Sequence, residues 1–375
     1  MKRCLVGMLI LLIVLVGVVS NSRKVFAQQA VPEMQFESAN ALKLPPELNL
    51  GEASGVAVNS KGHIFVFTRS NSANGPAYGA TAAQLLEFAP DGKFLREIGK
   101  GLYAWSFAHT VRVDKDDNVW CVDKGSNTIV RFNPEGHVTM VFGRKGEASD
   151  GAEPPPRGGP PPRHQNGRFN QPTDIAWNAA GDMFISDGYK NSRVAKIDKN
   201  GDWVKSWGER GNGPGQFNTP HSIAVDAKGD VYVADRGNRR IQVFDSDGNF
   251  LRQFTIDVPA PADARSAFGD PPPPDNQPPG SMSNGAPDAM CITPGPNQIM
   301  YVADLFPGRI YKVSLDGKVL GVFGKSGKQL GQFGWVHQLA CPSENVIYAA
   351  ELLNWRVQKL VLRADRQSKT SAGNR

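Results

Sequence analysis

Cysteine is scarce in this chain, and its few cysteines lie far apart. The 375 residues include four cysteines, Cys4, Cys121, Cys291 and Cys341. A small fold held together by disulfides needs an even, closely spaced set of cysteines, so the sequence excludes that class of protein. The last three cysteines each lie in an apolar, strand-like segment. We therefore predict that these three are buried free thiols.

The long hydrophobic run of this chain lies at its N-terminus and is short for a membrane span. Residues 1–27 combine a basic start, an apolar run from Leu5 to Val19 and a small-residue end, Val25-Phe26-Ala27. This is the pattern of a secretory signal peptide. We expect export to the periplasm or the extracellular space, with no stable membrane insertion after cleavage.

An excess of charge of one sign is absent once this segment is set aside. The formal net charge of the whole chain is +6, but residues 1–27 contain four basic residues and no acidic ones. The remaining chain therefore carries about +2 by the same count. A nearly neutral protein of this kind gives no case for a nucleic-acid partner.

Helical periodicity is also missing, which argues against an α/β fold. Instead, one unit recurs in which apolar runs alternate with turns rich in Gly, Asn and Asp. This alternation predicts a meander of antiparallel strands. The six copies cover residues 52–98, 107–142, 171–207, 219–254, 286–323 and 335–362.

Such a meander cannot bury both of its faces alone, but six of them arranged radially cover one another. We therefore predict an all-β, six-bladed β-propeller over residues 28–363. The sixth unit has only three strands, and we expect residues 33–37 to supply its outer strand and close the ring. Proline-rich inserts near 148–168 and 258–281 are expected to be surface loops, and 364–375 a flexible tail.

Histidines occur at one aligned position of the repeat, at the start of the predicted innermost strand. Three of the six histidines of the chain fall there, in units two, four and six. Innermost strands line the channel of a propeller, so these side chains should meet at one level. Three imidazoles that converge can bind one zinc ion and leave a fourth position open. The alternative is that each histidine is an ordinary buried polar group. Round the ring, the column reads Ser54, His109, Thr173, His221, Asp288 and His337.

Two further columns follow the second strand of each unit. The first is mostly acidic, and acidic residues at strand ends usually bind turns rather than catalyse; it reads Thr68, Asp123, Asp187, Asp235, Asp304 and Glu351. The next position reads Arg69, Lys124, Gly188, Arg236, Leu305 and Leu352. Arginines there would overhang the same end of the channel as the histidines. They would suit an anionic substrate, although each alone could be a solvated surface residue.

Three segments give the sequence a resemblance to a known family. They read QPTDIAWNAAGDMFISDGYKNSRV, WGERGNGPGQFNTPHSIAV and VYVADRGNRRIQVF. The units resemble NHL repeats, and these segments together with the alternate histidines resemble the peptidyl-α-hydroxyglycine α-amidating lyase family. The similarity covers nearly all of the six units, residues 52–362.

The resemblance implies a set of site residues. Zinc would be bound by His109, His221 and His337. Tyr189, in DGYKNSR, would be the catalytic base, with Arg69 and Arg236 as its partner arginines. The family also holds a structural calcium ion.

In this chain the calcium ion would be held by the backbone carbonyls of Val56 and Val111 together with an aspartate, but Gln338 stands at the position of that aspartate. An amide oxygen can bind calcium, yet the negative charge is lost. Lys190 stands where the family has a cysteine, so the disulfide of the family at the tyrosine motif is absent here.

The implied reaction is the cleavage of the C–N bond of an N-acyl-α-hydroxyglycine or related carbinolamide to an amide and glyoxylate. Zinc would activate the hydroxyl group, Tyr189 would take its proton, and the arginines would hold the carboxylate. We accordingly expect a carbon–nitrogen lyase that is monomeric and acts on a small carboxylate-bearing substrate.

Two other functions fit the same scaffold. One is a metal-dependent, lactonase-like hydrolase, although such sites are rich in oxygen ligands and imidazole favours zinc or another transition metal over calcium. The other is a non-catalytic propeller that binds a protein, with the proline-rich loops as its contact surface.

Overall fold

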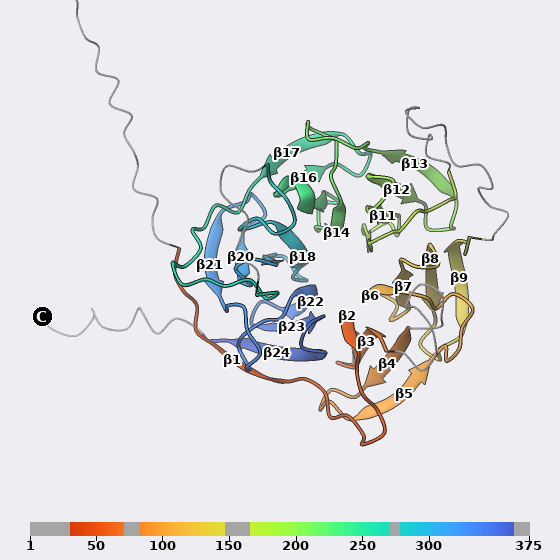
Figure 1. Cartoon of the computed structure of the whole chain (residues 1–375). Coiled ribbons are helices and arrows are strands. Elements are labelled where there is room, and N and C mark those ends of the chain that lie inside the picture. Colours follow the sequence, from red (N-terminus) through yellow and green to blue (C-terminus); the bar gives the residue numbers. More distant parts are fainter. Residues whose placement is uncertain (1–30, 71–82, 147–165, 270–277, 364–375) are drawn as a thin grey trace, which may run out of the picture. The chain divides into compact units, whose positions relative to one another are not determined.

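The computed structural model describes residues 31–70, 83–146, 166–269 and 278–363. All of them lie in the second of the two units into which the chain divides, residues 31–375. Six four-stranded antiparallel sheets are arranged radially in this unit (Figure 1). The predicted six-bladed β-propeller is therefore confirmed. The proposed signal peptide and tail lie outside the described residues.

The strands follow the repeat closely, and one short 3-10 helix, η1 (Arg236–Asn238), follows the second strand of blade four. Blades one to three contain β2 (Glu52–Val58), β3 (Ile64–Arg69), β4 (Gln84–Phe88) and β5 (Phe94–Ile98); β6 (Ala108–Val113), β7 (Val119–Asp123), β8 (Thr128–Phe132) and β9 (Val138–Gly143); and β10 (Asp174–Trp177), β11 (Met183–Asp187), β12 (Arg193–Ile197) and β13 (Trp203–Trp207).

Blades four to six have the same order, with the innermost strand first. They contain β14 (Pro220–Val225), β15 (Val231–Asp235), β16 (Arg240–Phe244) and β17 (Phe250–Phe254); β18 (Pro287–Ile292), β19 (Met300–Asp304), β20 (Ile310–Val313) and β21 (Val319–Phe323); and β22 (Val336–Ser343), β23 (Val346–Glu351), β24 (Arg356–Leu362) and β1 (Phe36–Asn40). No helix in these described ranges is long and apolar enough to cross a membrane.

The ring is closed by the N-terminal segment, as predicted, but the closing strand is displaced along the chain. It spans Phe36–Asn40 rather than 33–37 and pairs antiparallel with β24. Residue Glu33 instead forms a bridge to Val322 in the outer strand of blade five. Because residues 32–34 bond to β21 of blade five, the strand that closes blade six starts three residues later than expected.

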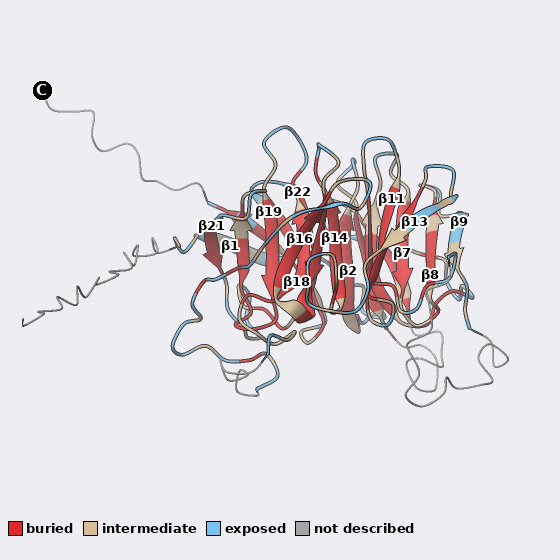
Figure 2. Ribbon diagram, turned by 90° about the horizontal axis from the view of Figure 1, so that it is seen from above, coloured by how far each residue is buried: buried red, intermediate tan, exposed pale blue. Residues whose placement is uncertain are grey.

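The hydrophobic cores lie between neighbouring blades. In the core between blades one and two, the Phe67 and Trp105 rings lie 4.8 Å apart, and the Trp105 and Phe132 rings 5.8 Å apart. Full burial of one such side chain contributes about 2–3 kcal/mol. Inner strands such as β14 and β18 are buried, whereas outer strands such as β9 and β13 are more exposed (Figure 2). These cores hold the innermost strands in register around the channel.

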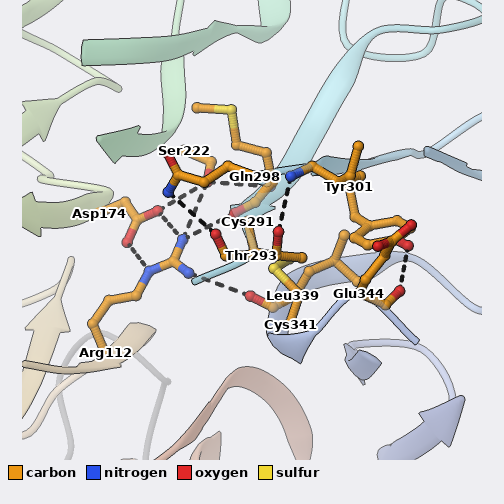
Figure 3. Close-up of a disulfide and its surroundings, with 12 residues drawn as sticks. Arg112, Asp174, Ser222, Cys291, Thr293, Gln298, Tyr301, Leu339, Cys341 and Glu344 are labelled. Carbon is orange, nitrogen blue, oxygen red and sulfur yellow. Dashed lines mark hydrogen bonds and ion pairs between the residues drawn. A yellow bond between two sulfur atoms is a disulfide. The ribbon is translucent and has the colours of Figure 1, made fainter. Parts of the chain in front are cut away.

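The prediction of three free thiols was wrong for two of them. Cys291 of β18 and Cys341 of β22 form a disulfide whose Cα atoms lie 6.0 Å apart (Figure 3). The two residues are 50 positions apart in the chain, but their strands are neighbours in the ring, a proximity that the spacing of the cysteines does not reveal. Cys121 is buried and free, as predicted.

Candidate functional site

The three column histidines converge at one end of the channel. His109, His221 and His337 are all buried, and their ring centres lie 4.5–4.9 Å apart. Each can offer one nitrogen such that these atoms all lie within 4.8 Å of one another. The convergence predicted from the repeat is therefore present.

A backbone irregularity directs these side chains toward the channel. In blades two, four and six the strand pairing shifts at the histidine itself, between Ala108 and Thr110 in blade two and between Pro220 and Ser222 in blade four. A bulge of this kind leaves one residue out of the regular ladder and re-aims its side chain. The histidines thus point inward instead of into the cores between the blades.

The hydrogen bonds of the imidazoles fix which nitrogen carries the proton. The Nδ1 atoms of His109, His221 and His337 lie 2.6–2.7 Å from the carbonyl oxygens of Thr173, Asp288 and Ser54, respectively. A carbonyl only accepts, so each Nδ1 donates and each Nε2 presents a lone pair. The three carbonyls belong to the column position of the next blade, so each imidazole is oriented by the neighbouring innermost strand.

The electrostatics of the cluster favour neutral imidazoles. Burial lowers the pKa of each histidine well below its usual value, and the neighbouring imidazoles lower the pKa values of His109 and His337 further. For His221 the second cause is the Arg236 guanidinium. Neutral imidazole is the form that binds metals. Three lone pairs held together by backbone carbonyls fit a cation such as zinc, since orientation of this kind is typical of metal-binding histidine.

Tyr189 lies against the same cluster. Its hydroxyl oxygen is 3.3 Å from Nε2 of His109 and 3.2 Å from Nε2 of His221. The preceding residue, Gly188, lies so close to blade four that a Cβ atom there would be 1.9 Å from the carbonyl oxygen of Pro220. This close approach explains why the cationic column is interrupted by glycine in blade three and why the tyrosine follows it.

Arg236 is positioned by an acidic residue to which the sequence analysis gave no role. The guanidinium donates to Oδ1 of the buried Asp288 at 2.6 Å. The other carboxylate oxygen accepts from the Trp335 indole at 2.6 Å, and the carbonyl of Asp288 accepts from His221. Asp288 therefore connects Arg236, the Trp335 indole and the column histidine His221. In the sequence, Asp288 could have been recognised as a site residue because it is the one acidic residue in a column otherwise made of His, Ser and Thr.

The cationic column forms an arc beside the histidines. Arg69 donates to the carbonyl of Ala108 at 2.9 Å and to Glu52 at 2.8 Å, and its guanidinium lies 4.0 Å from the centre of the Phe107 ring. Arg69 and Arg236 thus both occupy the end of the channel that the sequence predicted.

Lys124 is the third member of this arc. Its Nζ lies 5.3 Å from the Phe107 ring centre and 3.7 Å from the Tyr189 ring centre. The guanidinium of Arg236 also faces Tyr189, at 5.7 Å from its ring centre. Such contacts are cation–π interactions. Burial lowers the pKa of Lys124 to about 8, with further lowering by Arg69 and Arg236.

The acidic column binds turns, as expected. The Asp123 carboxylate accepts from the backbone N–H groups of Ser106 and Phe107 at 2.9 and 3.0 Å. In blades three, four and six the acid also pairs with the first residue of the third strand: Asp187 with Arg193, Asp235 with Arg240, and Glu351 with Arg356. These contacts hold the segments that lead into the innermost strands.

Gln338 replaces ion coordination with hydrogen bonds. Its Oε1 accepts from the backbone N–H groups of Val56 and Val111 at 3.2 and 3.0 Å, and its Nε2 donates to the Val111 carbonyl at 2.5 Å. One of the two carbonyls that the resemblance assigns to calcium, that of Val111, is thus bonded to a neutral amide. The residues present at this place do not fit a calcium ion.

Part of the second proline-rich insert borders the site. The Phe268 ring packs on the Trp335 ring at 5.2 Å, and Trp335 in turn lies 6.3 Å from the His337 ring. Neither aromatic residue was singled out from the sequence, although Trp335 precedes a predicted ligand by two positions. The insert therefore borders the histidine end of the channel next to His337.

A cavity of about 380 Å³ lies at the opposite end of the channel. It is lined mainly by apolar residues of the innermost strands, and no column histidine borders it. Arg112 reaches into the channel there and pairs with Asp174, with Nε–Oδ1 and Nη2–Oδ2 distances of 2.9 and 2.5 Å (Figure 3). The three histidines and the cationic arc lie at the other end of the channel.

Comparison with known proteins supports the fold and a family relationship. The NHL repeat family model matches residues 217–244, which contain β14, β15 and β16. The chain is 27% identical over 263 residues to the peptidyl-glycine alpha-amidating monooxygenase of Mus musculus, covering 63% of this chain and 25% of that protein. It is 29% identical over 172 residues to a probable peptidyl-alpha-hydroxyglycine alpha-amidating lyase of Caenorhabditis elegans, covering 42% and 44%.

The chain is also similar to proteins whose names mention no amidation. NHL repeat-containing protein 3 of Mus musculus is 34% identical over 196 residues, covering 47% of this chain and 50% of that protein. The chain thus spans between a quarter and a half of these relatives. A streptogramin B lyase structure superimposes with a TM-score of 0.54 at 12% identity, covering 88% and 98% of the two chains, which shows the fold alone. The chain is a six-bladed β-propeller with an NHL repeat at residues 217–244, and its sequence is similar to those of peptidyl-α-hydroxyglycine α-amidating lyases.

Proposed function

We propose that this protein is a zinc-dependent lyase that cleaves the C–N bond of an N-acyl-α-hydroxyglycine or a related carbinolamide, giving an amide and glyoxylate. The observation that carries the proposal is the convergence of three Nε2 lone pairs and the Tyr189 hydroxyl at one point beside an arc of cations. Sequence similarity to amidating lyases supports the same reaction.

The three imidazoles would hold zinc and leave a position open for substrate. When bound there, zinc supplies Lewis acidity to the carbinol oxygen of the substrate. The Tyr189 oxygen lies beside the same point, so its phenolate form can accept the carbinol proton. As the C–O bond becomes a carbonyl, the C–N bond breaks and the amide leaves.

Arg236 has the geometry to hold the substrate carboxylate. Asp288 and the cluster bury this arginine, and its Nε atom is buried without a hydrogen-bond partner among the described residues. A buried donor of this kind is costly unless something accepts its hydrogen bond. A carboxylate supplied by the substrate would do so, and Arg69 could add a second contact from the other side of the arc.

The ligand set favours this reaction over the lactonase-like alternative, because three imidazole nitrogens suit zinc better than calcium. We further propose that the protein is exported, acts as a monomer and binds a small carboxylate-bearing substrate rather than nucleic acid. Calcium is not required in this proposal, since the Gln338 amide bonds to the Val111 carbonyl and stands where the calcium-binding aspartate would be.

The test combines metal analysis with a glyoxylate-release assay on N-benzoyl-α-hydroxyglycine. The purified protein should contain about one zinc ion per chain and release glyoxylate. His221→Ala should lose both, whereas His137→Ala, at an exposed turn, should lose neither. A protein that lacks zinc and gains no activity when zinc is added would overturn the proposal, and a propeller that only binds proteins would keep its binding in the His221→Ala variant.

A further inference from the structure

The proposed reaction needs a second proton transfer. When the C–N bond breaks, its electron pair goes to the amide nitrogen, and this nitrogen must gain a proton to leave as a neutral amide. Tyr189 takes a proton from the carbinol and is not free to give one at the same moment. A group that donates a proton should therefore lie close to Tyr189 but approach the substrate from a different side.

Lys124 lies in this position. Its Nζ is over the face of the Tyr189 ring, 3.7 Å from the ring centre, while the hydroxyl of that tyrosine contacts two histidines at the edge of the ring. The ammonium group thus borders the place where the substrate would meet the metal and the base, and it lies above the plane of the Tyr189 ring.

The backbone that carries Lys124 is held firmly. Its N–H donates to the Phe107 carbonyl at 3.0 Å. The preceding Asp123 ends β7, is fully buried, and accepts from the N–H groups of Ser106, Phe107 and Ser126. This turn fixes the backbone of Lys124, and the Phe107 and Tyr189 rings flank its ammonium group.

The surroundings of the ammonium group are cationic. The groups that face it are Arg69, Arg236, Lys190, Tyr189, His109 and His221. Burial is the largest cause that lowers the pKa of Lys124 to about 8, and the two arginines and Lys190 lower it further. A lysine of this kind is still charged at pH 7, yet gives up its proton more readily than an exposed one.

We propose that Lys124 is the general acid that protonates the leaving amide nitrogen, an inference that rests on the proposed lyase function. The carbinol proton passes to the Tyr189 phenolate, the C–O bond becomes a carbonyl, and the C–N electron pair moves to nitrogen. The nitrogen takes a proton from the Lys124 ammonium. The products are a neutral amide and glyoxylate, and one proton returns from Tyr189 to Lys124 before the next turnover, so that atoms and charge balance.

The decisive experiment varies the leaving group. Lys124→Met is compared with the wild type on N-benzoyl-α-hydroxyglycine and on its p-nitrobenzoyl analogue, whose amide anion is the better leaving group. On the benzoyl substrate kcat should fall by about 10²–10⁴-fold, the usual contribution of a general acid. The loss should be clearly smaller on the nitro analogue, with zinc content and KM little changed. Loss of the same size on both substrates, or a change in KM alone, would overturn the inference and assign Lys124 to binding.

Two further variants separate charge from proton donation. Lys124→Arg keeps the positive charge but holds its proton too firmly to donate it, so it should not restore kcat. Lys115→Met removes an exposed lysine of the same blade that takes no part in the site and should behave as the wild type. Full kcat in Lys124→Arg would contradict proton donation.

The pH profile gives an independent readout. An acid must be protonated to act, so kcat of the wild type should fall as pH rises through about 8, and this alkaline limb should be missing in Lys124→Met. If the wild type releases no glyoxylate at any pH, the lyase function itself fails and this inference falls with it. If the wild type is active and Lys124→Met matches it in rate and profile, only the inference fails.

Discussion

At the scale of single residues, the site is organised by backbone carbonyls as much as by side chains. Each column histidine donates from Nδ1 to the carbonyl of the next blade, so the ring nitrogen that faces the centre is always the one with a lone pair. A buried imidazole without such a partner could adopt the other tautomer and would be a poorer ligand. The backbone carbonyls of Ser54, Thr173 and Asp288 therefore set the orientation of the three imidazoles.

Gln338 shows how a single residue can replace an ion. Its amide both accepts from two N–H groups and donates to a carbonyl, so the innermost strands of blades one, two and six are linked without metal. We predict that the thermal unfolding midpoint of the wild type does not change when a calcium chelator is added.

The matching variant is Gln338→Asp. A carboxylate cannot donate to the Val111 carbonyl, and the lost hydrogen bonds should lower the free energy of unfolding by about 1–3 kcal/mol. The new carboxylate at position 338 would then face the Val111 carbonyl. Because both are oxygen ligands, added calcium should recover part of the lost stability. Calorimetry with and without calcium measures both effects. A wild type that is destabilised by the chelator would contradict the interpretation.

The site residues that the sequence did not reveal depend on contacts across blades. The histidine column was visible because the repeat puts chemically similar residues in register. Asp288 was visible as a column member, but its bonds to Arg236 and Trp335 join different blades. Nothing in the spacing of these three residues predicts that they touch, and the disulfide between Cys291 and Cys341 was missed for the same reason.

At the scale of elements, the same arrangement of hydrogen bonds recurs at the ends of the second strands. Most of these ends place a buried carboxylate against backbone N–H groups, and three of them add an arginine. The repeat predicted this column well, because each blade carries its own copy. It predicted the closing strand less well, because no second copy of that segment exists to fix its bounds.

Blade five departs from the pattern, with a consequence for pH dependence. Asp304 accepts from three backbone N–H groups and from the Tyr311 hydroxyl, while the Arg309 side chain turns away to Glu33. Without a guanidinium partner, burial raises the pKa of Asp304 to about 7.

This carboxyl group keeps its proton in the folded state at a pH where the unfolded chain has released it. Its effect on stability is therefore most favourable at low pH and is lost as pH rises from about 4 to about 7. In Asp304→Asn this part of the pH dependence should disappear. Urea unfolding at pH 5 and pH 8 compares the two proteins, and equal pH dependence in both would show that Asp304 does not titrate in this range.

At the scale of the whole propeller unit, the disulfide and the histidine cluster lie at different ends of the channel. The histidines and cations lie where the innermost strands begin, whereas Cys291 and Cys341 lie three and four residues beyond Asp288 and His337. At about 3.3 Å per residue, the disulfide is roughly 10 Å further along these strands. It joins the innermost strands of blades five and six, and β1 is the outermost strand of blade six.

We therefore expect the disulfide to serve stability alone. Replacing both cysteines by alanine should lower the free energy of unfolding by about 2–4 kcal/mol, because the bond closes a long loop in the unfolded chain. Zinc content and kcat at 25 °C should stay at wild-type values, since no metal or substrate group is removed. Urea unfolding, metal analysis and the glyoxylate assay on the double variant measure all three quantities. Wild-type protein kept in a reducing agent should match the double variant, and a loss of zinc in either would mean that the far end of the channel is needed to hold the histidines in place.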